Sequence, residues 1–277
     1  MKIDLCMWTK EGAKTLPQVF QRINQAIPPE AVNQKFIVDD HSKDYTKEIA
    51  KLYGWEVRLN KGCGISDGAN TTLSYIETPI FASFEQDVLL AQNWWRKIWT
   101  LTNKPNFAAA SGCRFTSQPR SVNLMEQFSH QHHNQNPLYG RTLDNTLYKT
   151  EAIREVGGYP NMKANCGIDI VLSHLLEQKG YKWYVDYSLQ SIHIKTSSIL
   201  SHMKRITWYG TAENEIRNKA GLKPLNLKLT TLKLPRSIPV GLYISAKMKY
   251  PQIAALYPIE TLSRYQGFIK SRRTTNA

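Results

Sequence analysis

Apolar and polar residues alternate in blocks along the first third of the chain, and the spacing within each block predicts its structure. Four short apolar runs are typical of buried strands: residues 2–9, 35–40, 55–60 and 79–84. Three intervening segments carry apolar residues at the helical period: 15–27, 44–54 and 65–77. Strands that alternate with helices in this way predict an α/β fold with a mainly parallel sheet.

The alternation is lost between about residues 112 and 146, where the chain is polar and rich in Gln, Asn and His. We expect a long loop there, and a loop of this length inside a compact domain is usually functional or mobile. Regular patterns then return with an ordered segment, a helix and two closing strands: residues 147–160, 167–180, 181–187 and 189–195.

Acidic residues follow two of the predicted strands. Asp39 and Asp40 end one apolar run, and Glu85 and Asp87 come directly after another. In parallel α/β sheets ligands bind outside the carboxyl ends of the strands, so we expect these side chains at the rim of a ligand crevice. Each pair has two interpretations, as hard oxygen ligands for a divalent metal or as a solvated turn at a strand end.

Glycines between the two acidic pairs favour a nucleotide site. The segment NKGCGISDGAN, residues 60–70, allows a ligand to approach the backbone closely, but it lacks the Lys-Ser/Thr ending of a P-loop and is not a GxGxxG motif. An acid after the earlier strand can accept hydrogen bonds from a base or ribose, and an acid after the later strand can hold a metal on a diphosphate. Together these features predict a nucleoside-diphosphate site.

Charge divides the chain into two parts. The net charge of the 277 residues is +14, and residues 201–277 hold 14 Lys or Arg against 3 Asp or Glu, a balance of +11. A hydrophobic content of 42% is ordinary for a globular protein with a core. We predict a globular domain over residues 1–215 and a basic extension over 216–277, which would face either nucleic acid or an anionic membrane surface.

The four cysteines are scattered and form no CxxC pair, so we expect free thiols in a reducing cytosol, with a disulfide as the alternative. The apolar run at the N-terminus is too short for a signal peptide. No stretch approaches the roughly 18 apolar residues that span a bilayer. These features predict a cytoplasmic protein.

Six segments carry motifs in a fixed order over roughly residues 3–215: 8–20, 36–54, 64–70, 81–90, 147–182 and 187–198. The most specific is FIVDDHSKDYTKEIAKLYG, which resembles the VDDxSxDxT segment of glycosyltransferase family 2, the inverting nucleotide-sugar transferases of GT-A fold. FASFEQDVLL stands in the place of that family's metal-binding DxD motif. The resemblance implies a GT-A-like fold, a single Rossmann-type three-layer sandwich with a mainly parallel sheet.

The same resemblance implies a reaction and its residues. The chain would be a hexosyltransferase that moves a sugar from a nucleoside-diphosphate sugar to a glycan hydroxyl or a lipid phosphate, by a single displacement with inversion. Asp87 and His193 would hold a divalent metal, and Asp169 would be the general base. An imidazole ligand favours Mn²⁺ without excluding Mg²⁺. Donor contacts are expected from five residues: Thr9, Glu11, Asp40, Gly64 and Glu85.

Two positions depart from the family pattern. Glu85 replaces the first aspartate of the DxD motif, and of an expected Glu-Asp pair only Asp169 is retained, after Ile168. A glutamate is one methylene longer than an aspartate and can still reach a metal or a sugar. On position alone, His193 is also typical of a surface strand, and Asp169 of a helix N-cap.

For other conspicuous side chains we prefer a structural role to a role in ligand binding. Trp94 and Trp95 could stack on a sugar, but we expect them in the core. The HQHH segment at residues 130–133 lacks the usual spacing of zinc ligands, so we expect it in the polar loop, facing solvent or substrate.

The basic extension begins within an amphipathic helix predicted at residues 201–220, and its apolar patches at 240–249 and 253–270 are interleaved with Lys and Arg. Such segments lie in membrane interfaces, or they form a helical appendage packed on the catalytic domain. We expect a peripheral protein on the cytoplasmic membrane face, without a nucleic-acid partner.

Two other functions stay open. One is a basic nucleic-acid- or membrane-binding protein without catalysis, although no nucleic-acid module is recognisable. The other is a sugar nucleotidyltransferase, which needs a glycine-rich basic loop that residues 8–16 fit poorly.

Overall fold

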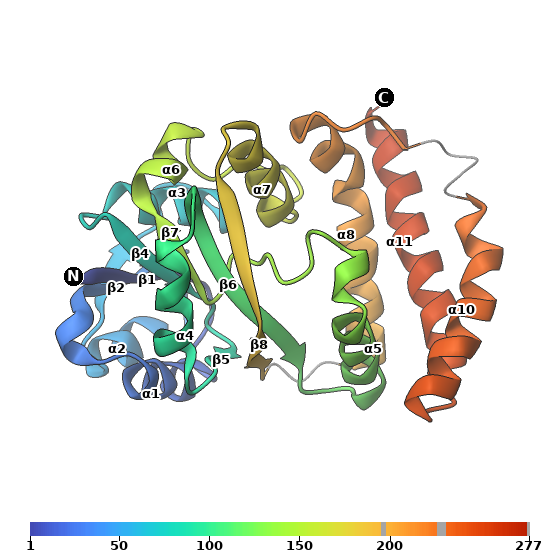
Figure 1. Ribbon diagram of the computed structural model, residues 1–277, viewed down its shortest axis with the longest axis horizontal. Coiled ribbons are helices and arrows are strands. Elements are labelled where there is room, and N and C mark those ends of the chain that lie inside the picture. Colours follow the sequence, from blue (N-terminus) through green and yellow to red (C-terminus); the bar gives the residue numbers. More distant parts are fainter. Residues whose placement is uncertain (195–197, 226–230, 276–277) are drawn as a thin grey trace. The chain divides into compact units, whose positions relative to one another are not determined.

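The computed structural model describes residues 1–194, 198–225 and 231–275, which form two compact units (Figure 1). Unit 1 comprises residues 1–115, 138–161 and the described part of 168–195. Unit 2 comprises 116–137, 162–167 and the described residues from 198 onwards. Part of the predicted motif at 187–198 and part of the predicted basic extension therefore lie outside the described residues.

Unit 1 is built on one eight-stranded sheet, in the order β3-β2-β1-β4-β7-β6-β8-β5. The strands are β1 (Ile3–Thr9), β2 (Val32–Asp39), β3 (Glu56–Leu59), β4 (Ile80–Phe84), β5 (Val88–Leu89), β6 (Phe107–Thr116), β7 (Thr146–Lys149) and β8 (Lys182–His193). The parallel pairing predicted from the sequence joins β1 to β2 and β4, and β2 to β3. The other half of the sheet adds antiparallel pairs, β7 with β4 and β6, and β5 with β8.

Helices cover both faces of this sheet, α1, α2 and α4 on one side and α3, α6 and α7 on the other (Figure 1). Their bounds are α1 (Leu16–Ala26), α2 (Thr46–Leu52), α3 (Gly64–Ser74), α4 (Trp94–Thr100), α6 (Thr150–Glu155) and α7 (Ile168–Gln178), with short 3₁₀ turns η1 (Pro29–Ala31) and η2 (Leu101–Asn103). α1 buries Leu16, Val19, Phe20 and Ile23, the residues that its helical period places on one face. These pack in one core with the fully buried Trp94.

The register of the parallel strands brings their carboxyl ends to one edge. Thr9 is level with Asp39 across the β1–β2 pair, and Met7 is level with Phe84 across the β1–β4 pair. The segments that follow β1, β2 and β4 therefore leave the sheet side by side. This edge carries the acidic residues that the sequence analysis selected.

Two sequence predictions about the second half of the chain were wrong. The polar stretch from 112 is not one long loop, because β6 continues to Thr116 and is followed by α5 (Arg120–Gln131) and the turn η3 (His133–Gln135). The apolar positions of α5, among them Val122 and Met125, pack in unit 2. The two closing strands are one twelve-residue strand, β8, in which residues 182–193 run without interruption.

Unit 2 consists mainly of four helices: α5, α8 (Ile199–Lys219), α10 (Lys233–Met248) and α11 (Ile253–Thr275). α8 and α11 touch backbone to backbone at two glycines. A Cβ on Gly267 would lie 1.9 Å from Thr207 O, and one on Gly210 would lie 2.1 Å from Arg264 O. By these contacts α8 belongs with the C-terminal helices, so unit 2 takes in a helix that begins before the predicted boundary at residues 215/216 and runs across it.

None of the helices that the structure describes is both long and apolar enough to cross a membrane. Within the described residues none of the four cysteines forms a disulfide, as the sequence analysis expected.

Candidate active site

Three candidate metal ligands gather where β4 ends. Glu85 and Asp87 follow the strand directly, and Asp87 leads into β5. β5 pairs with the end of β8, where Val88 is level with His193, so this pairing brings the histidine to the acids. His193 Nε2 lies 3.3 Å from Asp87 Oδ2, and one ligand atom from each of the three side chains lies within 4.8 Å of the others.

These residues fit a divalent cation. Two carboxylates and an imidazole are a donor set that Mn²⁺ and Mg²⁺ accept, with the nitrogen favouring Mn²⁺. Opposite ligands of an octahedral Mg²⁺ site lie about 4.2 Å apart, so the observed separations need only small side-chain movements. The predicted pair of Asp87 and His193 is therefore close enough to act together, and Glu85, predicted as a donor contact, joins it.

Gln86, which the sequence analysis did not select, ties this cluster to the end of β1. Its Oε1 accepts hydrogen bonds from Thr9 Oγ1 and from Lys10 N (2.9 Å), and its Nε2 donates to Lys10 O (2.9 Å). Gly12 packs closely beside it: a Cβ there would lie 2.9 Å from Thr9 Oγ1 and 3.0 Å from Gln86 Oε1, so a side chain would push on this hydrogen bond. Gln86 thus fixes the loop between the two acids against the predicted donor residue Thr9.

Asp40 is the centre of a second cluster on the same edge. Its Oδ2 accepts from Lys10 Nζ and Gly64 N, both at 3.2 Å, and its Oδ1 accepts from Asn60 Nδ2 at 3.0 Å. Burial raises the pKa of Asp40, but the hydrogen bonds from Lys10, Gly64 and Asn60 outweigh it and hold the pKa below its usual value. Two predicted donor residues, Asp40 and Gly64, are thereby in direct contact.

Glu11 takes part in the turn that supports this edge. Its Oε1 accepts a hydrogen bond from Lys43 N (2.9 Å), and its own N–H donates to Ser42 Oγ (2.9 Å). Its backbone has φ 51°, in the left-handed region that few non-glycine residues adopt. The structure therefore places Glu11 beside the Asp40 cluster, with its carboxylate engaged by the loop that follows β2.

Arg114, on β6, is a cation that the sequence analysis missed. Its Nη1 donates to Glu85 Oε2 at 2.9 Å and lies 3.4 Å from Asp144 Oδ1. Asp144 is only 2% exposed, and its Oδ2 has no hydrogen-bond partner in the described part of the chain. Burial, followed by repulsion from Asp144, raises the pKa of Glu85 to about 8, although Arg114 opposes this. Arg114 is thus held between a buried acid and a candidate metal ligand.

Asp169 belongs to the same electrostatic neighbourhood. It is the second residue of α7, and its Oδ1 accepts a hydrogen bond from Ile170 N (2.9 Å), so it lies inside the first turn and is not the N-cap that its position had suggested. Burial raises the pKa of Asp169 to about 6, with Arg114 acting against this and Asp144 adding to it. A carboxyl with such a pKa is ionised at neutral pH yet can accept a proton readily.

Arg114→Gln is expected to destabilise the fold by about 1–3 kcal/mol, because Asp144 would remain buried without its cation. Unfolding in urea should reveal the loss, and the exposed Arg96→Gln on α4 is the matched control. Removing both charges with Arg114→Gln/Asp144→Asn should restore part of the stability. Additive effects of the two substitutions would contradict a direct interaction.

The remaining conspicuous residues are structural. Trp94 is fully buried, and its Nε1 donates to Asn145 O (3.0 Å), while Trp95 packs on Trp99 with ring centroids 4.8 Å apart. The predicted core position is therefore confirmed for Trp94, while Trp95 is half-buried and packs against the edge of the same core. The HQHH segment lies at the end of α5 and in η3, where His132 Nδ1 is 2.8 Å from Phe128 O, so it is helical and not a loop.

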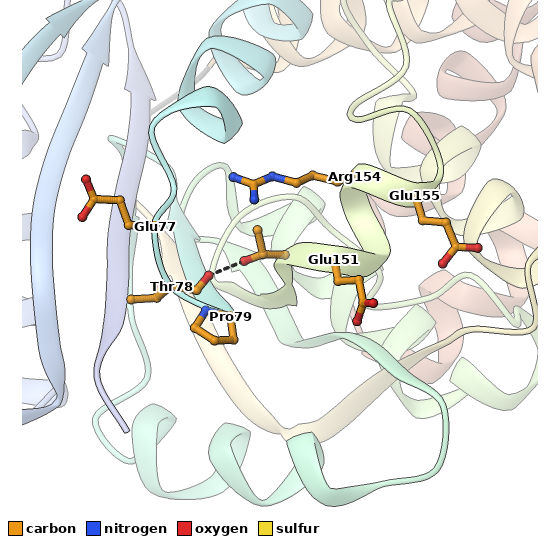
Figure 2. A pocket seen from close by; sticks show the side chains of 7 residues that line it. Glu77, Thr78, Pro79, Glu151, Arg154 and Glu155 are labelled. Atoms are coloured by element: carbon orange, nitrogen blue, oxygen red, sulfur yellow. Dashed lines mark hydrogen bonds between the residues drawn. The ribbon is translucent and has the colours of Figure 1, made fainter.

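An open groove of about 610 Å³ lies at the opposite end of β4 from the acidic cluster. Figure 2 shows it between the segment before β4 and helix α6, with Thr150 Oγ1 donating to Thr78 O (2.6 Å). Arg154, on its wall, donates to Ile76 O (2.8 Å). Because ligands of α/β sheets bind at the carboxyl edge, this groove is separate from the candidate active site. Its lining residues are Glu77, Thr78, Pro79, Thr150, Glu151, Arg154 and Glu155.

Comparison with solved structures shows that the chain shares a GT-A glycosyltransferase fold. It is similar to a mannosyltransferase from Pyrobaculum calidifontis in complex with GDP-Man and Mn²⁺, with a TM-score of 0.67 and 16% identity over 99% of this chain and 86% of the other. It is also similar to glucosyl-3-phosphoglycerate synthase from Mycobacterium tuberculosis in complex with Mn²⁺, UDP and glucosyl-3-phosphoglycerate (TM-score 0.58, 12% identity, 80% and 81% of the two chains). TarS of S. aureus matches with a TM-score of 0.56 and 13% identity over 98% of this chain and 54% of that one.

A comparison with curated protein sequences finds no match. The model of the family described as glycosyl transferase family 2, however, matches residues 4–158, which is more than half of the chain and includes β1, β2, β4 and the acids that follow them. The chain therefore belongs to glycosyltransferase family 2.

Proposed function

We propose that the protein is a metal-dependent, inverting glycosyltransferase that moves a hexose from a nucleoside-diphosphate sugar to an acceptor hydroxyl or a lipid phosphate. The observation that carries this proposal is the junction of two clusters at one sheet edge. Gln86 joins the candidate metal ligands to Thr9 and Lys10, and Lys10 in turn contacts Asp40. A diphosphate can therefore span from the metal ligands to the Asp40 cluster.

Asp40 and its neighbours would bind the nucleoside part of the donor. Asp40 stays ionised over a wide pH range, because its pKa is held low by three hydrogen bonds, and an ionised carboxylate accepts hydrogen bonds from ribose hydroxyls or from a base. Lys10, whose side chain is 61% exposed beside it, adds a positive charge for the phosphates. Gly64 begins α3, and the N-terminus of a helix favours an anion.

Glu85, Asp87 and His193 would hold the divalent cation, Mn²⁺ or Mg²⁺. When bound, such a cation neutralises charge on the diphosphate leaving group. The chain's own residues orient it: Gln86 fixes the loop between Glu85 and Asp87, and the β5–β8 pairing fixes His193. The mannosyltransferase and the synthase that share this fold are both described in complex with Mn²⁺.

Asp169 would act as general base. In a single displacement the acceptor oxygen forms a bond to the anomeric carbon, the bond from that carbon to the diphosphate oxygen breaks, and the acceptor's hydroxyl proton passes to Asp169. Inversion follows because the attacking oxygen and the leaving group lie on opposite faces of the sugar. A lipid-phosphate acceptor is already ionised near neutral pH, so a reaction with such an acceptor needs no base.

Two alternatives lose support. A protein without catalysis and a sugar nucleotidyltransferase both disagree with membership of a glycosyltransferase family over residues 4–158. The absence of a disulfide among the described residues is consistent with the proposed cytoplasmic location.

Thermal unfolding with candidate donors tests the proposal directly. UDP, GDP, UDP-glucose and GDP-mannose would each be added with Mn²⁺, with Mg²⁺ or with EDTA. A ligand at 100 times its Kd stabilises the native state by about 2.7 kcal/mol, which is a rise in Tm of about 5–10 °C for a protein of this size. We expect one nucleotide series to give this rise only with a divalent metal. A rise that persists in EDTA, or none for any nucleotide, would contradict the proposed site.

A further inference from the structure

Helix α10 has a buried face that attaches it to unit 2. Ser237, Gly241 and Ile244 are buried at intervals of three and four residues. Ile244 packs with Ile253 and Leu256 of the following helix and with Val122 and Met125 of α5. Beside this face, the ring of Tyr243 contacts Phe128 of α5 edge-on, with centroids 6.0 Å apart. Ile238 and Leu242 are not part of this core cluster.

The opposite side of α10 is apolar and exposed. Ile238 is 55% exposed, Leu242 57% and Tyr243 51%, and Leu232, just before the helix, is 50% exposed. Ile238 and Leu242 are four residues apart, so they follow one another along one face of the helix. Large apolar side chains that are exposed together mark an interaction site more often than chance.

Positive charge borders this apolar face. Lys233, Arg236 and Lys247 lie on α10, and the helix contains no Asp or Glu. Lys247 Nζ lies 5.6 Å above the ring of Tyr243, so one of the cations is adjacent to the exposed aromatic. The pattern of apolar and aromatic residues flanked only by cations is typical of helices that lie in the plane of a membrane surface.

We propose that α10 is a membrane-docking helix, which lies flat in the headgroup region of a bilayer containing anionic lipids. Ile238, Leu242 and Tyr243 enter the boundary between headgroups and acyl chains, and Arg236 and Lys247 contact lipid phosphates. The helix does not cross the bilayer, in agreement with its sixteen residues. α10 would bind lipid in this way whether or not the proposed transfer reaction is correct.

Charge distinguishes this partner from two others. A second copy of the chain would present the same cations to the cations of the first, which disfavours pairing of two α10 faces. Nucleic acid would use Arg236 and Lys247 but leaves Ile238 and Leu242 exposed, since backbone binding depends on phosphate contacts. An anionic bilayer uses both the charge and the apolar residues.

Flotation of the full chain with vesicles tests the proposal. We expect the chain to bind vesicles of phosphatidylcholine that contain about 30% of the anionic lipid phosphatidylglycerol. Binding should be weaker at high salt, and little binding is expected to phosphatidylcholine alone. Ile238→Glu/Leu242→Glu should lower the partition coefficient at least about tenfold, because two large apolar side chains no longer enter the bilayer. Arg236→Gln/Lys247→Gln should lower it about fivefold for each charge.

Matched variants on another helix keep the test specific. Ile199→Glu/Leu200→Glu changes two exposed apolar residues at the start of α8, and Lys219→Gln with Lys223→Gln removes two exposed charges. Both should bind vesicles nearly as the unaltered chain does, and unchanged melting temperatures show that all variants fold. Equal losses in these controls would overturn the assignment to α10. So would absence of binding to anionic vesicles, strong binding to duplex DNA in its place, or a dimer in light scattering that Ile238→Glu/Leu242→Glu dissociates.

Discussion

Asp87→Ala should reduce sugar transfer by at least about 10²-fold, one of the two catalytic losses that the site predicts. A metal that neutralises a leaving group contributes several kcal/mol to the transition state, and each 1.36 kcal/mol is tenfold in rate. Asp87 is the central candidate ligand, because it lies next to His193 on one side and two residues from Glu85 on the other. Without it, the remaining pair would hold a cation weakly.

Two measurements check this result. Initial rates with the donor identified by thermal unfolding report the chemistry, and titration of Mn²⁺ by calorimetry reports the site itself. Glu151→Gln is the matched control, since this acid lines the groove at the far end of β4 and is engaged only by Lys149 among the ion pairs described. Unchanged Mn²⁺ affinity in Asp87→Ala would place the metal elsewhere, and a near-normal rate would remove the metal from the mechanism.

His193→Ala should also lower the transfer rate, but by less than Asp87→Ala does, because an imidazole adds a metal ligand but no negative charge. Its place beside Asp87 depends on the β5–β8 pairing, which the sequence does not reveal. A strand of two residues, Val88–Leu89, has too short a pattern to be recognised. His193 was predicted as a metal ligand from the order of the family motifs, and the apolar pattern alone would not have indicated it.

The predictable part of the site consists of residues next to regular elements. Asp39 ends a strand, and Asp40, Glu85 and Asp87 follow strands, whose apolar runs are plain in the sequence. The parallel register brings all four to one edge. The βα alternation in the first half of the chain was equally readable, because each strand and helix there has its own hydrophobic period.

Arg114 and Gln86 show where this reasoning stops. Arg114 lies near the end of β6, in a segment whose polar residues obscured the strand, and its partner Asp144 precedes β7 by two residues. Gln86 acts through an amide that contacts Thr9 and Lys10, far away in the sequence. Such contacts depend on three-dimensional register and not on local pattern. The alternation of residues 111–116 was the signal that could have extended β6 to Arg114.

The long polar stretch that proved to be α5 illustrates a second limit. Val122 and Met125 are its buried apolar positions, and they stand among Asn, Gln, His and Ser. The helix is stabilised by packing within unit 2, against Ile244 and Ile253, and tertiary packing of this kind overrides weak local preference. Composition therefore suggested a loop where long-range contacts produce a helix.

Asp169→Asn should lower the transfer rate to a hydroxyl acceptor by about 10²–10⁴-fold, the size of general-base catalysis. The pH profile supplies a second signature. Because burial raises the pKa of Asp169 to about 6, the base loses its charge below that pH, and kcat/KM should fall as the pH drops through about 6. In Asp169→Asn the residual rate should lack this inflection.

The same substitution should make the fold more stable at neutral pH. A carboxyl whose folded pKa lies above its ordinary value of 3.8 binds more protons in the native state than in the unfolded state between pH 3.8 and about 6. Stability therefore falls as the pH rises through this window, and an uncharged amide avoids the loss. Lower activity together with higher unfolding free energy would identify a strained functional carboxylate, since a residue with a structural role would lose both. Near-normal turnover of Asp169→Asn with a hydroxyl acceptor would assign the proton transfer to another group. If Asp169→Asn turns over normally only with a lipid-phosphate acceptor, that acceptor is already ionised and needs no base.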